Sequence, residues 1–79
     1  MITATIDNVI YKGLHIEVAL FSNNGKTATA YIIDDNFVMM TCEGKDIFES
    51  RNFTGDDIVA AAEKHIGTIE RVTVNYLTF

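Results

Sequence analysis

The feature that most constrains the fold is an Asn-Gly pair set between two alternating stretches. Residues 14–21 alternate between apolar and other side chains, Asn24-Gly25 follows, and residues 26–33 alternate again. A period of two is typical of a β-strand with one buried face. Asn-Gly accepts the positive φ angles of a tight hairpin turn, so the two stretches are predicted to pair as antiparallel strands.

Further turn signals extend this hairpin into a meander. Residues 34–36 read Asp-Asp-Asn, a turn composition, and precede a third strand over 37–42. Residues 43–46 turn the chain again into a short strand over 47–50. Residues 2–11 are rich in β-branched side chains and are broadly strand-like. This part of the chain is therefore expected to hold four to five antiparallel strands.

The pattern changes to helical signals after these strands. Thr54 is a good N-cap residue, and Asp56 and Asp57 follow in the first turn, where the helix dipole favours negative charge. Gly67 suits the C-cap. Between them, three apolar residues recur at a spacing of four: Ile58, Ala62 and Ile66. One amphipathic helix is predicted, with a β-branched strand over residues 68–79 after it.

Helix and sheet are expected to bury each other, because the helix has one apolar stripe and the sheet one apolar face. The predicted fold class is α+β: an antiparallel meander of four to five strands, one helix packed on the sheet and a C-terminal strand form a two-layer domain. With 79 residues the chain is long enough for one domain and too short for two, so residues 1–79 are expected to form a single globular domain. It has no proline, which leaves every strand edge able to pair.

Alternation also assigns side chains to the two faces of the sheet. Three residues share one face of the last strand: Val72, Val74 and Tyr76. Met39 and Met40 are expected to point to opposite faces, so at least one of them is expected on the less covered side. Phe21 and Tyr31 are the aromatic residues expected on the uncovered face. The other candidate anchors for a partner, most of them expected in the core, are Phe48, Phe53, Tyr76 and Phe79.

The charges are acidic overall and unevenly placed. Eleven Asp and Glu stand against six Lys and Arg, for a formal net charge of −5, and the bases are scattered along the chain. Direct nucleic-acid binding needs clustered cations and is not expected. Antiparallel connectivity instead brings four carboxylates to one end of the sheet: Asp34, Asp35, Asp56 and Asp57. Lys12 and Arg51 are the only bases expected near them.

These four carboxylates, termed the acidic end, are the candidate binding site. We expect the acidic end to contact a protein partner with a basic surface, such as a complex that handles nucleic acid. The same residues also have local explanations, because Asp and Asn are common in turns and Asp is common at helix starts.

Cys42 is the only cysteine and the first candidate for a nucleophile. A reactive thiolate needs a His or a helix N-terminus beside it, and neither His15 nor His65 forms a motif with Cys42. These three residues are too dispersed to suggest a zinc site, and residues 34–36 lack the ligand spacing of a calcium loop. No catalytic residue, metal or cofactor is therefore expected, and a thiol-dependent enzyme using Cys42 is the least favoured alternative.

The remaining signals concern location. No basic segment followed by a long apolar run marks a secretory signal, and no apolar run reaches the ~20 residues of a membrane span. The single cysteine suits a reducing compartment. A cytoplasmic location without membrane contact is expected.

The general features of the chain point to a class of function. A very short, acidic, cysteine-poor α+β chain without a catalytic constellation resembles small phage or mobile-element inhibitors, anti-CRISPR proteins among them. The resemblance implies a non-enzymatic protein-binding domain that blocks the nucleic-acid-binding surface of a basic partner. The alternative is a self-assembling or structural subunit, a homodimer included, held by strand edges or a sheet face.

Overall fold

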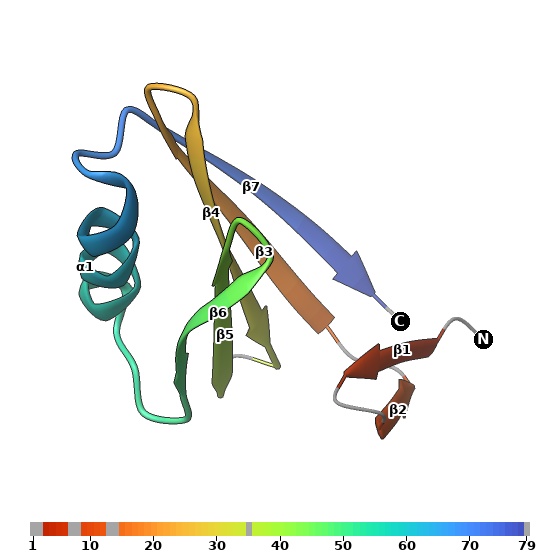
Figure 1. Ribbon diagram of the computed structural model, residues 1–79. Coiled ribbons are helices and arrows are strands. Elements are labelled where there is room, and N and C mark those ends of the chain that lie inside the picture. Colours follow the sequence, from red (N-terminus) through yellow and green to blue (C-terminus); the bar gives the residue numbers. More distant parts are fainter. Residues whose placement is uncertain (1–2, 7–8, 13–14, 35, 79) are drawn as a thin grey trace.

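The computed structural model describes the backbone of residues 3–6, 9–12, 15–34 and 36–78 and the side chains of residues 15–34 and 36–77. Within these ranges the chain forms seven strands and one helix (Figure 1): β1 Thr3–Ile6, β2 Val9–Lys12, β3 His15–Asn23, β4 Lys26–Ile33, β5 Phe37–Cys42, β6 Lys45–Ser50, α1 Gly55–Ile66 and β7 Arg71–Thr78. The α+β class predicted from the sequence is confirmed, and β4 and β5 have the predicted bounds.

The strands form a two-stranded sheet, β1-β2, and a five-stranded main sheet in the order β6-β5-β4-β3-β7, antiparallel throughout. Strands β3 to β6 follow the predicted meander, and β7 returns to pair with β3. The described part of residues 2–11 differs from the prediction, because it holds two short strands paired with each other. In the sequence, the β-branched run is interrupted at this point by Asp7 and Asn8, two residue types that are common in turns.

The predicted Asn-Gly hairpin turn joins β3 to β4. Asn24 and Gly25 have φ angles of 51° and 85°, the left-handed pair that a two-residue turn of this type requires. The turn sets the register, in which Asn23 lies opposite Lys26. Since residues directly opposite each other share a face, this register determines which side chains α1 can cover.

Helix α1 begins and ends at the predicted caps. The Thr54 hydroxyl accepts a hydrogen bond from the Asp57 N–H (3.2 Å), and the Asp57 carboxylate accepts one from the Thr54 N–H (2.8 Å). This reciprocal pair is a capping box, which satisfies donors that the first turn leaves free. At the other end Gly67, with φ 84°, donates its N–H to the Glu63 carbonyl (3.0 Å).

Helix α1 packs on one face of the main sheet, against β4 and β3 (Figure 1). The sheet beneath it presents small residues, Ala19, Ala28 and Ala30, and Ala62 of the helix is fully buried in the same core. Small side chains at these positions let the helix approach the sheet closely. Larger apolar residues complete this core: Phe21, Val38, Met40, Ile58 and Ile66. The predicted apolar stripe of the helix is confirmed as its buried face.

The opposite face of the main sheet carries a second apolar cluster. Its buried members are Ile16 and Ile33, and Val18, Tyr31, Phe37 and Met39 pack against them. The predicted separation of the two methionines is confirmed, because Met39 belongs to this cluster and Met40 to the core beneath α1.

The prediction that Phe21 lies on the uncovered face is wrong. Phe21 is 3% exposed and belongs to the core beneath α1. The register gives the reason, because Phe21 lies opposite Ala28, whereas Leu20 lies opposite Thr29. The odd-numbered residues of β3 therefore face the helix, and its even-numbered residues face away from it.

Candidate interaction surface

Asp34, the first residue of the predicted acidic end, closes the end of the β3–β4 pair. Its φ angle is 50°, its N–H donates to the His15 carbonyl (2.9 Å), and its Oδ1 accepts from the His15 N–H (3.0 Å). Asp tolerates the left-handed conformation because its side chain can bond nearby backbone in this way. Asp34 therefore has a structural role in the turn.

The two helical residues of the acidic end lie in the first turn of α1. The Asp57 carboxylate is engaged in the capping box with Thr54, and Asp56 is exposed. Asp35 lies outside the described residues. Two of the three described carboxylates thus stabilise local structure, and a partner-binding role for the acidic end stays a prediction.

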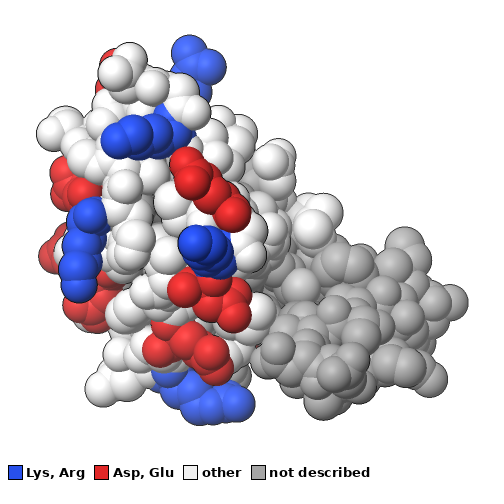
Figure 2. Space-filling model, viewed as in Figure 1, with Lys and Arg blue, Asp and Glu red and all other residues white. Residues whose placement is uncertain are grey.

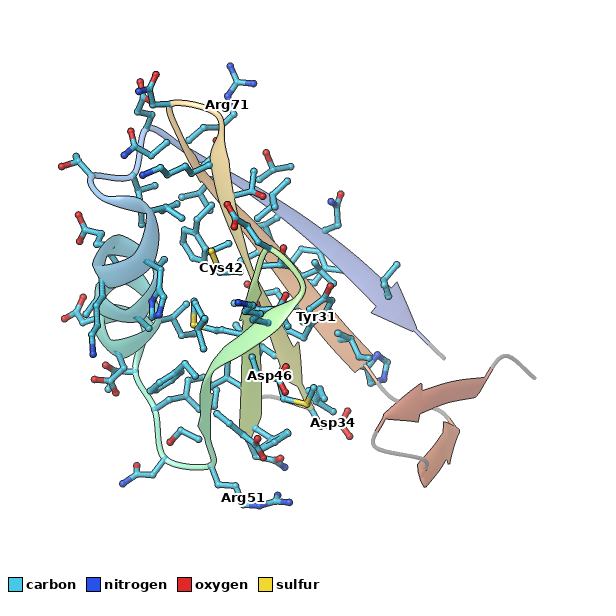
Figure 3. All side chains as sticks on the ribbon, viewed as in Figure 1. Tyr31, Asp34, Cys42, Asp46, Arg51 and Arg71 are labelled. Carbon is cyan, nitrogen blue, oxygen red and sulfur yellow. The ribbon has the colours of Figure 1, made fainter. Side chains whose placement is uncertain are left out.

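Basic side chains lie among the acidic ones rather than apart from them. Figure 2 shows Lys and Arg interleaved with Asp and Glu over the coloured part of the visible face, so this part presents no extended field of one sign. Arg51 lies at the same end of the sheet as Asp34 (Figure 3). Its guanidinium carbon is 4.8 Å from the centre of the Phe37 ring, a cation–π distance. Connectivity had predicted Arg51 at this end.

Cys42 and His65, which no sequence motif connects, line one open hollow of about 450 Å³. The half-buried Cys42 thiol (Figure 3) donates to the Thr27 carbonyl (3.4 Å), and the His65 Nδ1 lies 3.0 Å from the Ala61 carbonyl. Both of these contacts are with backbone. Among the described residues, no three His, Cys, Asp or Glu side chains gather as metal ligands. No sequence pattern predicts this neighbourhood, because it arises from the packing of α1 on the sheet.

Strand β7 forms one edge of the main sheet and is exposed along residues 71–77. Six large apolar side chains are exposed in the described part of the chain, and four of them lie on β7: Val72 (50%), Val74 (41%), Tyr76 (76%) and Leu77 (45%). The helix packs against β4 and β3, and β7 lies beyond them (Figure 1). Among the elements whose side chains the structure describes, β7 therefore holds most of the large apolar residues that are exposed to water.

Val72, Val74 and Tyr76, termed here the edge strip, share one face of β7, as alternation predicted. Val72 lies opposite Phe21 and Val74 opposite Ala19, two residues of the core beneath α1. The edge strip is therefore on the helix side of the sheet, as an outward continuation of the core surface.

The backbone of the edge strip points away from the main sheet. The Asp34 N–H bonds the His15 carbonyl, so odd-numbered residues of β3 direct their backbone groups toward β4. Because this direction alternates along a strand, the even-numbered residues of β3 bond to β7. Their partners in β7 are Arg71, Thr73, Asn75 and Leu77. The N–H and C=O groups of the edge strip are thus directed outward, where a further strand can bond them.

The fold and this edge define a small α+β domain with an open strand, and comparison with known proteins adds no family to that description. No protein-family model and no curated protein matches the sequence, and no solved structure matches the chain. Within the described residues, no helix has the length and apolar character needed to cross a membrane.

Proposed function

We propose that this chain is a non-enzymatic protein-binding domain that holds its partner by accepting an added β-strand at β7. The observation that carries the proposal is the edge strip, three exposed apolar residues whose backbone groups point outward. In strand addition, main-chain hydrogen bonds supply affinity and alternate side chains supply specificity. The edge strip offers both on one strand.

Burial of the edge strip by a partner strand would stabilise the complex. Complete burial of a Val-sized side chain contributes about 1.5–3 kcal/mol, and roughly half of that remains for a residue that is already half covered. A hydrogen bond between backbone groups adds about 0.5–1.5 kcal/mol after its exchange with water. Several such terms together can offset the loss of freedom on association.

Two expectations from the sequence belong to this proposal. A two-layer domain, in which one helix covers part of one sheet face, accounts for an edge strand left open. The single cysteine supports a cytoplasmic location, where thiols stay reduced.

The acidic end is the competing contact surface for the same function. A partner bound there is a protein with a basic surface, such as a nucleic-acid-handling complex blocked by an inhibitor of the anti-CRISPR kind. The net charge of −5 supports this version. Asp34 and Asp57 already have turn and capping roles, however, whereas the edge strip has no comparable local role. The edge strip is preferred on that ground.

Affinity capture with two variants separates these surfaces. Val74→Pro removes an outward N–H and no bond to β3, and proline is tolerated at edge positions of this kind. Asp56→Lys reverses a charge of the acidic end at an exposed residue. Proteins from a cell lysate that are lost with Val74→Pro and retained with Asp56→Lys support strand addition at β7. The reverse pattern, with release at high salt, contradicts it and favours the acidic end.

A matched pair of lysine variants controls for charge and lost apolar surface. Val59 on α1 is 38% exposed and Val74 is 41% exposed, so Val59→Lys and Val74→Lys make the same change at similar exposure. Only Val74→Lys is expected to abolish capture, because Lys at an edge strand opposes pairing. Equal losses from the two variants would show a general effect of charge and count against β7. Circular dichroism of each variant establishes that it is folded.

A further inference from the structure

We propose that the strand added at β7 belongs to a second copy of this chain, paired antiparallel with β7 about a two-fold axis through Val74. The inference rests on the proposed function, because it names the partner of the edge strip. In this arrangement the main sheets of the two copies join edge to edge into one continuous sheet, with both helices on the same side.

The side-chain pattern of β7 is self-complementary about Val74. Apolar residues at 72, 74 and 76 alternate with Thr73 and Asn75. Under the two-fold axis, Val72 of each copy lies opposite Tyr76 of the other, and Val74 lies opposite its own equivalent. An aromatic residue opposite a β-branched one is a favourable cross-strand pair. The two edge strips merge into one apolar band, and Thr73 faces Asn75 on the other side of the sheet.

Backbone direction agrees with the same register. The outward N–H and C=O groups belong to Val72, Val74 and Tyr76, so pairs formed among these residues exchange hydrogen bonds. Three such pairs, with two bonds each, give about six backbone hydrogen bonds between the copies. A shift of one residue would set outward groups opposite inward ones and apolar side chains opposite polar ones.

Charge placement favours a copy of this strand as the partner. Arg71 is the one charged residue of β7 and lies at its start (Figure 3). In an antiparallel pair the two Arg71 side chains lie at opposite ends of the apolar band, so like charges do not meet. A second copy therefore brings no charge that the contact must bury.

The other edge of the main sheet limits the assembly to two copies. Strand β6 carries Lys45, Asp46 and Glu49, and its pairing with β5 shifts register between Met40 and Thr41. Charges and irregular pairing of this kind oppose the addition of a strand. The β7 contact therefore closes as a dimer and does not continue into a filament.

Sedimentation velocity over protein concentrations from about 1 µM to about 1 mM, a range that covers weak interfaces, tests the dimer. The unmodified chain is expected to pass from monomer to dimer. Val74→Pro is expected to weaken dimerisation by at least about ten-fold, because it removes the N–H that each copy donates to the other at the two-fold axis. Val59→Lys, which lies off the strand, is expected to leave it unchanged.

Amide hydrogen exchange tests the same contact without a variant. The amides of Thr73 and Asn75 bond to β3 and are protected in the monomer, whereas those of the edge strip are protected only in the dimer. Protection of Val72, Val74 and Tyr76 that rises with concentration supports the proposal, even where Val74→Pro fails to fold. Fast exchange of these amides at the highest concentration, together with monomeric sedimentation, overturns it.

Cysteine variants in a Cys42→Ser background test the register. Val74→Cys sets two thiols opposite each other across the axis, within reach of a disulfide. Val72→Cys sets them roughly 14 Å apart, at ~3.4 Å per residue along the strand. Oxidised glutathione is expected to link Val74→Cys chains into dimers and to leave Val72→Cys chains unlinked. Preferential linking of Val72→Cys overturns the proposed axis.

Sedimentation and lysate capture together distinguish a second copy from another protein as the partner of β7. If the chain stays monomeric while lysate capture depends on Val74, the partner is another protein, and the second-copy inference alone is wrong. If Val74→Pro changes neither sedimentation nor capture, both are wrong.

Discussion

The two edge strands of the main sheet, β6 and β7, differ in the charge of their side chains and in the regularity of their pairing. Strand β6 carries Lys45, Asp46 and Glu49 beside a shifted register. Strand β7 has Arg71 at its start and no charged residue from 72 to 78. Charge and irregular pairing protect an edge strand from further pairing, and their absence leaves it receptive. This sheet therefore has one protected edge and one open edge, and the open edge is the one suited to binding a partner.

The position of the helix adds to the same asymmetry. One flank of α1 faces β6, where Ile47, Phe48, Ala61 and His65 line a hollow of about 290 Å³. A helix with its side chains is ~10 Å wide, whereas five strands at ~4.8 Å spacing span roughly 19 Å. One helix therefore cannot cover the whole face, and the strand it leaves uncovered is β7.

The largest expected effect compares a buried residue of β5 with an exposed one of β7. Met40 is fully buried and Val74 is 41% exposed. Met40→Ala is expected to lower the free energy of unfolding by about 2–5 kcal/mol, because it leaves a cavity in the core. Val74→Ala has little packing to lose and is expected to cost under about 1 kcal/mol. Urea unfolding at low protein concentration measures both.

A loss of several kcal/mol in a domain of this size approaches its total stability, so partial unfolding of Met40→Ala in buffer is an expected outcome. Equal costs for the two variants would mean that β7 is packed within the monomer. That result would contradict an open edge.

Local signals account for the part of this fold that could be predicted from the sequence. The turn at Asn24-Gly25 and the cap at Thr54 depend on immediate neighbours, and so do the bounds of β4 and β5. The pairing of β7 with β3 joins distant parts of the chain, and no local feature of β7 selects its neighbour. The prediction for Phe21 is wrong for the same reason, because β3 has apolar residues on both faces and only the register decides which face α1 covers.

The candidate surface, like the fold, can be predicted from the sequence only in part. Alternation is enough to place Val72, Val74 and Tyr76 on one face. Their exposure depends on the strand order and on the reach of α1, which are properties of the assembled sheet. The hollow shared by Cys42 and His65 is likewise a product of packing between distant elements.

Removal of a charge from β6 makes this edge strand more similar to β7. Glu49 lies opposite Met39, on the face away from α1. Glu49→Val removes a charge from this edge, and assembly beyond a dimer is expected to strengthen by about ten-fold, or about 1.4 kcal/mol. Light scattering measures the assembly. Glu63→Val on the exposed side of α1 removes the same charge and serves as control. Equal assembly of both variants would show that net charge, and not the edge, controls it.

A smaller effect concerns the way the start of β7 is attached. The Glu70 Oε1 accepts from the Asn24 N–H (2.6 Å), and the Glu70 N–H donates to the Ser22 carbonyl (2.9 Å). Glu70→Ala removes the side-chain bond at an exposed site and is expected to cost about 0.5–1 kcal/mol of unfolding free energy. Exchange of the Thr73 amide is expected to quicken by a few-fold. Glu70→Gln keeps an acceptor and should restore most of the loss; no rescue would assign the effect to charge instead.

Salt gives the smallest effect and separates the two kinds of partner most directly. Two copies of a chain with net charge −5 repel each other, while β7 brings no charge into the contact beyond Arg71. Raising the salt from about 50 mM to about 500 mM screens this repulsion and is expected to strengthen the dimer about two- to three-fold, roughly 0.4–0.7 kcal/mol. A basic partner held at the acidic end responds in the opposite direction, because screening weakens its attraction. Sedimentation at the two salt concentrations measures the change. A dimer that weakens at high salt would contain attractive charge pairs in its contact, which pairing through β7 does not supply, because Arg71 is the one charged residue of this strand.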